Sequence, residues 1–128
     1  MRCFVFQEWV TIRGSSTITS VVQGEELWLD TTPFQDLVFW TESREGTTGG
    51  GTLSLNFDTS PTRDDAFFTR MTGTNPSTTG VSVATARLLD GNLPVARWVR
   101  WRLSCSSATS TWDATFRIMV AANSPGGN

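Results

Sequence analysis

The densest group of chemically versatile side chains lies in residues 96–103, where tryptophan and arginine alternate with aliphatic residues. On an extended strand Trp98, Arg100 and Arg102 share one face, because successive side chains point to opposite faces. Guanidinium groups beside an indole make cation–π contacts worth about 0.5–1 kcal/mol at an exposed site. Tryptophan and arginine also dominate protein–protein hot spots. We therefore take Trp98, Arg100 and Arg102 as the candidate partner interface.

The same strand has other possible uses. Aromatic residues with arginine can form a groove for single-stranded nucleic acid, and exposed tryptophan can stack on sugars. Alternatively, the strand is central in a sheet, its aromatic side chains fill the core, and its arginines pair with neighbouring carboxylates. The residues alone leave these alternatives open.

Three aspartates, Asp58, Asp64 and Asp65, flank a short polar segment. Oxygen ligands this close together on a loop can bind calcium, but the spacing of a calcium-binding loop is absent. Turn and cap chemistry, with Arg63 and Arg70 as ion partners, is the simpler interpretation. We expect neither a bound metal nor a cofactor.

Carboxylate pairs such as Glu25 with Glu26, or Asp30 with Asp36, could in principle catalyse glycoside hydrolysis. Nothing in their spacing selects one pair. The chain has no histidine, the commonest general base, and no lysine, so all 10 basic residues are arginine. Serine–histidine and cysteine–histidine catalysis are therefore excluded within this chain, and we predict no enzymatic activity.

Charge and hydropathy narrow the choice of partner. The 128-residue chain has a net charge of −2, whereas nucleic-acid-binding domains usually carry a basic surplus. No apolar run approaches the roughly 20 residues that a membrane-spanning helix needs. No small-residue cleavage site follows the apolar N-terminal segment, so synthesis in the cytoplasm is expected. Neither nucleic acid nor a membrane is an expected partner.

Short apolar runs separated by turn residues organise the chain, which is typical of strands. Strands are predicted at residues 2–12, 16–22, 25–30, 36–43, 51–58, 80–88, 95–104 and 113–121. Alternation such as Leu53, Leu55 and Phe57 predicts one buried face per strand. About eight strands at this spacing favour an all-β, two-sheet antiparallel β-sandwich, jelly-roll-like, with an immunoglobulin-like sandwich as the alternative. We expect a single domain, 1–123, followed by a flexible C-terminal tail, 124–128.

One segment is ambiguous between helix and strand. Thr62 followed by Asp65 resembles a capping box, so residues 66–71 could form one or two helical turns. Phe67 and Phe68 also favour an edge strand. The glycine-rich stretch 47–51 is predicted to be a flexible loop without side chains to pack.

The cysteines and tryptophans raise questions of burial. Two buried thiols are the expected state of Cys3 and Cys105, and a disulfide between them is the alternative. Most of the 6 tryptophans are expected in the core. Both faces of the strands around Trp28 and Trp40 are apolar, which indicates burial on both sides or one face presented to a partner.

Several features are shared with a known class of proteins. These are the Thr–Gly-rich loops at 46–52 and 73–80, the aromatic–arginine strand at 96–103 and the closing strand at 114–120. In overall style the whole chain resembles small virion structural proteins of tailed bacteriophages, above all head decoration or cement proteins. The resemblance implies a jelly-roll-like sandwich and a homotrimer on the capsid exterior that bridges major capsid protein subunits. It carries over no catalytic residue.

The expected function is therefore that of a non-catalytic structural protein that stabilises a coat lattice. Symmetric copies would multiply a modest affinity at each site. The alternative is a carbohydrate- or cell-surface-binding module that uses exposed tryptophan.

Overall fold

The computed structural model describes residues 2–76, 80–87 and 95–123. The predicted tail, 124–128, lies outside the described residues. The strands are β1 (Arg2–Gly14), β2 (Ser20–Val22), β3 (Leu29–Asp30), β4 (Asp36–Thr47), β5 (Thr52–Ser60), β6 (Thr69–Thr74), β7 (Gly80–Arg87), β8 (Trp98–Ser106) and β9 (Trp112–Asn123). Two single 3-10 turns, η1 (Glu25–Leu27) and η2 (Asp65–Phe67), complete the described elements. None of the described helices is long and apolar enough to cross a bilayer.

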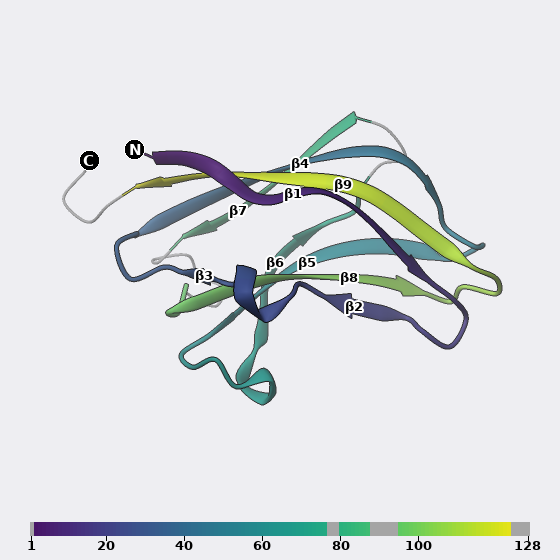
Figure 1. The fold of residues 1–128 in the computed structure, drawn as a ribbon, viewed down its shortest axis with the longest axis horizontal. Coiled ribbons are helices and arrows are strands. Elements are labelled where there is room, and N and C mark those ends of the chain that lie inside the picture. The colour runs from purple at the N-terminus through teal and green to yellow at the C-terminus, as the bar shows by residue number, and fades with distance from the viewer. Residues whose placement is uncertain (1, 77–79, 88–94, 124–128) are drawn as a thin grey trace.

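Two antiparallel sheets pack face to face (Figure 1). One sheet has the strand order β1-β9-β4-β7; the other has the order β2-β8-β5-β6, with β3 also pairing with β8. The first strand therefore pairs with the last, β2 and β3 with β8, β4 with β7, and β5 with β6. This nested pairing of early with late strands is the jelly-roll arrangement. The all-β sandwich is confirmed, and its strand order is not that of the immunoglobulin-like alternative.

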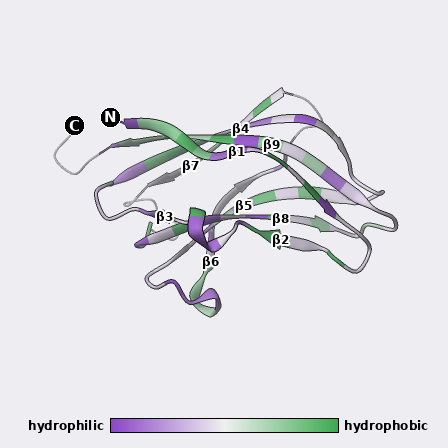
Figure 2. Ribbon diagram, viewed as in Figure 1, coloured by the Kyte–Doolittle hydropathy of each residue, from purple (hydrophilic) through white to green (hydrophobic). Residues whose placement is uncertain are grey.

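The core lies between the sheets because the alternating residues of each strand turn their apolar side chains inward. Leu55 and Phe57 are fully buried, as the alternation in β5 predicts. Across the sandwich, the rings of Phe39 and Phe57 stack with centroids 4.0 Å apart, and Trp101 meets Phe116 edge-on at 5.1 Å. Figure 2 shows hydrophobic and hydrophilic residues interspersed along the strands. Aromatic contacts from both sheets therefore tie the two layers together.

The segment that follows β5 contains both of the structures predicted for it, a helical turn and an edge strand. Asp64 caps η2, since its carboxylate accepts a hydrogen bond from the Ala66 N–H at 3.0 Å. Thr62 caps no helix; its hydroxyl accepts the Asp64 N–H instead. The chain then turns extended at Phe68 and enters the edge strand β6. The predicted strand at 25–30 is likewise replaced by η1 followed by the two-residue β3.

The glycine-rich turn between β4 and β5 is packed, which corrects the expectation of a loop with nothing against it. Gly49 has a φ of +60°, and its carbonyl accepts the Thr109 N–H at 2.9 Å. A Cβ on Gly51 would lie 2.2 Å from the Ser106 carbonyl oxygen. Glycine is needed here because the turn between β8 and β9 approaches too closely for a side chain.

Cys3 and Cys105 are both free thiols. Cys105 lies on the core side of β8, where burial raises the pKa of its thiol. Cys3 is exposed, because it alternates with the inward-facing Phe4 and Phe6 of β1. The expectation of two buried thiols is therefore wrong for Cys3. The alternative disulfide is absent, since Cys3 is exposed on the outside of its sheet whereas Cys105 is buried in the core.

Candidate interaction surfaces

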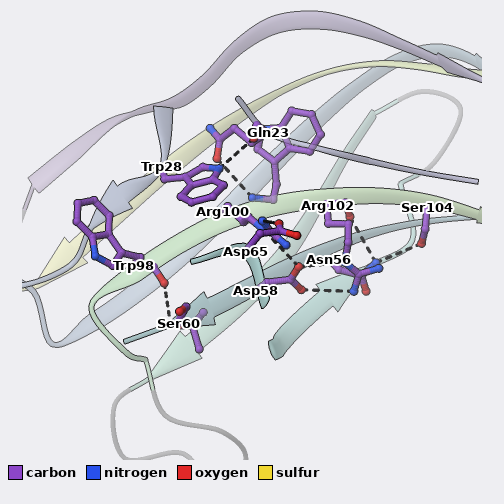
Figure 3. Close-up of polar contacts among 12 residues, drawn as sticks. Gln23, Trp28, Asn56, Asp58, Ser60, Asp65, Trp98, Arg100, Arg102 and Ser104 are labelled. Atoms are coloured by element: carbon purple, nitrogen blue, oxygen red, sulfur yellow. Dashed lines mark hydrogen bonds and ion pairs between the residues drawn. The ribbon is translucent and has the colours of Figure 1, made fainter. Parts of the chain in front are cut away.

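The central strand β8 divides its side chains between the core and the outer face of its sheet. Val99 and Trp101 are buried between the sheets, so Trp98, Arg100 and Arg102 face away from the core, as alternation predicts. The register places Arg100 opposite Asp58 of β5, and Figure 3 shows the polar contacts that result. The three residues of the candidate interface therefore share a face but have different surroundings.

Arg100 is enclosed within the fold and is only 5% exposed. Its guanidinium group pairs with Asp58, at 3.7 Å from Nε to Oδ2, and with Asp65 of η2. It also lies over the rings of Phe68 and Trp28, at centroid distances of 4.0 and 5.2 Å. The structure thus corrects the candidate interface at Arg100, because η1, η2 and the residues that follow them fold over it. Its role is to attach these segments to the sheet.

Asp58 is the buried acid of this cluster and pairs with two arginines. Its Oδ2 lies 3.0 Å from Arg102 Nε, and its Oδ1 lies 3.4 Å from Arg102 Nη2. Asn56 extends the network by accepting a hydrogen bond from Arg70 Nε at 2.8 Å. Because each buried charge has an oppositely charged partner, the outer face of a central strand can hold two arginines. The Arg102 side chain keeps 30% of its exposure and can still contact a partner.

Trp98 lies at the edge of the same cluster and is partly exposed. The guanidinium groups of Arg63 and Arg97 lie over its ring, at centroid distances of 4.9 and 5.3 Å. Arg63 Nη2 also donates a hydrogen bond to the Glu25 carbonyl at 2.9 Å. This bond links the segment just before η2 to η1. Trp98 and Arg102 therefore form a smaller candidate surface than the sequence indicates.

A second surface, which the sequence analysis did not identify, lies on the outer face of the sheet β1-β9-β4-β7. Paired residues place Val5, Met119, Trp40 and Val83 side by side across all four strands. Val5, Trp40 and Val83 are 42%, 39% and 52% exposed, and Val81 beside them is 61% exposed. We call Val5, Met119, Trp40 and Val83 the apolar row. Of these residues only Trp40 carried a signal in the sequence, namely apolar residues on both faces of its strand.

Charged residues border the apolar row on one side. Arg117 and Glu42 occupy paired positions and are joined at 2.6 Å. The guanidinium groups of Arg44 and Arg117 lie over the Trp9 ring, at 4.8 and 5.0 Å from its centroid. An apolar strip with a polar, arginine-containing rim is the usual composition of a protein interface.

Most of the tryptophan rings are either buried in the core or covered by an arginine side chain. Two tryptophans, Trp101 and Trp112, are buried, so the expectation that most would be is wrong. Guanidinium groups lie over three others, Trp9, Trp28 and Trp98, at centroid distances of 4.8–5.9 Å. Trp40 is the most exposed of the six and has no guanidinium group over it among the described residues. Arginine therefore occupies rings that a stacked sugar would need.

Two of the carboxylates considered for chemistry, Glu25 and Asp30, have structural partners. Hydrogen bonds from the Thr32 hydroxyl and N–H, at 2.6 and 3.0 Å, hold the pKa of Asp30 below its usual value. The expected ion partners of the acidic cluster, Arg63 and Arg70, instead bond to Glu25 and Asn56. Within the part of the chain that the structure describes, no three His, Cys, Asp or Glu side chains gather as a metal site would require.

Comparisons with models of known protein families, with curated proteins and with solved structures found no match to the chain.

Proposed function

We propose that this chain is a non-catalytic structural protein that assembles on a larger protein particle, in the manner of bacteriophage capsid decoration proteins. The observation that carries the proposal is the exposed apolar row, which crosses a whole sheet face without cover from any described segment. Exposed apolar strips of this kind mark sites of protein interaction.

The chemistry of the surface favours a protein partner over a carbohydrate. In the apolar row, two valines and one methionine accompany a single exposed tryptophan. The rings of Trp9 and Trp98, in contrast, already lie under arginine side chains. Apolar side chains gain most from burial against another apolar surface. An apolar strip bordered by charged residues has the composition of a protein interface.

A repeated lattice would compensate for the small size of one such surface. In this proposal several copies, three in the decoration-protein arrangement, bind neighbouring major capsid protein subunits on the outside of a virion. Simultaneous contacts raise the overall affinity well above that of one site. The proposed localisation is the virion exterior, after synthesis in the host cytoplasm.

The test is co-sedimentation of the purified chain with coat-protein particles from the same source that lack it. We expect the wild-type chain to bind, and Trp40→Ser and Val5→Ser to reduce the affinity at least about tenfold, since each removes a large apolar contact. Ile18→Ser is the matched control, because Ile18 is exposed in a turn outside both surfaces. The pair Trp98→Ala and Arg102→Ala tests the smaller surface in the same assay.

The outcomes separate the possibilities. Loss of binding in the Trp40 and Val5 variants, with the Ile18 variant unchanged, supports docking through the apolar row. Loss only in the Trp98 and Arg102 variants would move the contact to the other sheet. Absence of wild-type binding, together with a saturable change of tryptophan fluorescence on titration with oligosaccharides, would favour the carbohydrate-binding alternative.

A further inference from the structure

The four sheet edges of the sandwich are not equally protected against pairing with another chain. Native proteins protect edge strands by keeping them short, by placing charges on them or by interrupting them with bulges. β2 and β3 contain three and two residues. β6 carries Arg70 and a register shift opposite Phe57 and Asp58. β1 carries Glu8 and Arg13, with register shifts on both sides of Gln7.

The remaining edge strand, β7, has none of these protections over most of its length. It spans eight residues and pairs with β4 without any register shift. Its first seven residues are uncharged, and the one charge, Arg87, stands at the end, in register with Asp36. β6 contacts β7 without pairing with it. Among the described strands, none covers the outward-pointing N–H and C=O groups of β7.

We propose that β7 pairs antiparallel with β7 of a second copy of this chain, across a two-fold axis. The two β1-β9-β4-β7 sheets would then form one continuous eight-stranded sheet. With Val83 at the axis, residues 80–86 of the two copies would pair and form roughly six to eight backbone hydrogen bonds. The proposal goes beyond the proposed function, because it assigns a two-fold association of the isolated chain in place of the three copies that the decoration-protein arrangement implies.

Self-pairing is favoured by the distribution of charge and of apolar side chains along β7. In an antiparallel pair centred near Val83, Val83 faces its own copy and Val81 faces Thr85, all on the outer face. The two Arg87 residues then stand at opposite ends of the pair, so like charges do not meet. The apolar row of one copy also runs directly into that of the other, which doubles its length.

The symmetry makes the inference independent of the outcome for particle binding. A two-fold pair of edges closes on itself and gives an even number of copies. The decoration-protein resemblance implies three copies instead. The solution mass of the isolated chain therefore tests the β7 inference, whereas co-sedimentation with particles tests the function.

The experiment is light scattering coupled to size exclusion over a concentration series up to about 1 mM. We expect the wild-type mass to rise to twice the 14.1 kDa of one chain. Val83→Lys should remain monomeric at every concentration, because two ammonium groups would face each other at the axis. The matched control is Val22→Lys, at an exposed valine on β2, which should dimerise like the wild type. Circular dichroism checks that both variants fold.

Hydrogen exchange of the wild-type chain provides a test that needs no variant. The amides of residues 80–87 should exchange more slowly as the dimer forms, whereas those of residues 20–22 should not change. A monomer throughout, a stable trimer, or a dimer that survives Val83→Lys with unchanged exchange in β7 would each overturn the inference. A dimer that bound no particle would leave the inference standing and contradict the proposed function.

Discussion

Arg100 and Asp58 place opposite charges where water has little access. Burying either charge alone would cost several kcal/mol, so each is stable only with the other. Asp58 also holds Arg102, and Arg100 also holds Asp65, which extends the pair into a network. The network links a central strand to the two 3-10 turns that cover it. Its residues therefore act on the stability and shape of the surface, and only its outer members can reach a partner.

Removing the acid from this network should be costly. Asp58→Ala leaves Arg100 buried with a single anionic partner, and we expect it to lower the free energy of unfolding by about 3 kcal/mol. Glu25→Ala, which breaks the solvent-exposed pair with Arg63, should change stability little. Urea unfolding followed by tryptophan fluorescence measures both. Equal losses in the two variants would show that the buried network does not stabilise the fold.

At the scale of elements, the turn between β4 and β5 and the turn between β8 and β9 fit against each other. The Gly49 carbonyl accepts hydrogen bonds from the N–H and the hydroxyl of Thr109, at 2.9 and 3.2 Å. The close approach of backbone to backbone leaves no room for a Cβ at Gly51. These two turns belong to different strand pairs, so their contact joins one end of both sheets.

A methyl group at this contact should disrupt it. Gly51→Ala would place a Cβ 2.2 Å from a backbone oxygen, and we expect a loss of roughly 1–3 kcal/mol from overpacking. Gly24→Ala is the control, since the atoms nearest to its Cβ belong to the end of the flexible Glu26 side chain. Thermal unfolding by calorimetry compares the two melting temperatures. If Gly51→Ala had the same melting temperature as the wild type, the two turns could move apart without a loss of stability.

At the scale of the whole molecule, the sandwich depends on contacts between its two sheets. The stacked rings of Phe39 and Phe57 link β4 to β5 at the centre of the core. Trp101 and Phe116 form a second link between β8 and β9. Because each pair has one ring in each sheet, neither sheet can bury its inner face alone. We therefore expect the molecule to unfold as one cooperative unit.

Truncation of a linking ring tests this dependence. Phe57→Ala should lower the free energy of unfolding by about 3–5 kcal/mol, because it removes a buried ring and leaves a cavity. Phe67→Ala provides the comparison, since Phe67 is exposed on η2 and its loss should stay within about 0.5 kcal/mol. Denaturant unfolding monitored by near- and far-ultraviolet circular dichroism measures the change. Separate transitions for the two signals would show that the molecule does not unfold as one cooperative unit.

Features that depend on local chemistry follow from the sequence alone. Alternation in β5 predicted which of its side chains face the core, since a strand turns successive side chains to opposite faces. The same alternation placed Trp98, Arg100 and Arg102 on one face. The density of short apolar runs and turn residues predicted an all-β sandwich, and jelly-roll topology was its first choice.

Which outward faces are covered, and which residues become neighbours, depends on how distant segments of the chain come together. Arg100 is buried because segments 40 residues apart, η1 and η2, fold over the same strand. The apolar row exists because four strands from both ends and the middle of the chain lie side by side. Pairing between distant strands depends on the whole set of competing contacts, which no local pattern contains. The burial of an outward-facing side chain is therefore a property of the assembled fold.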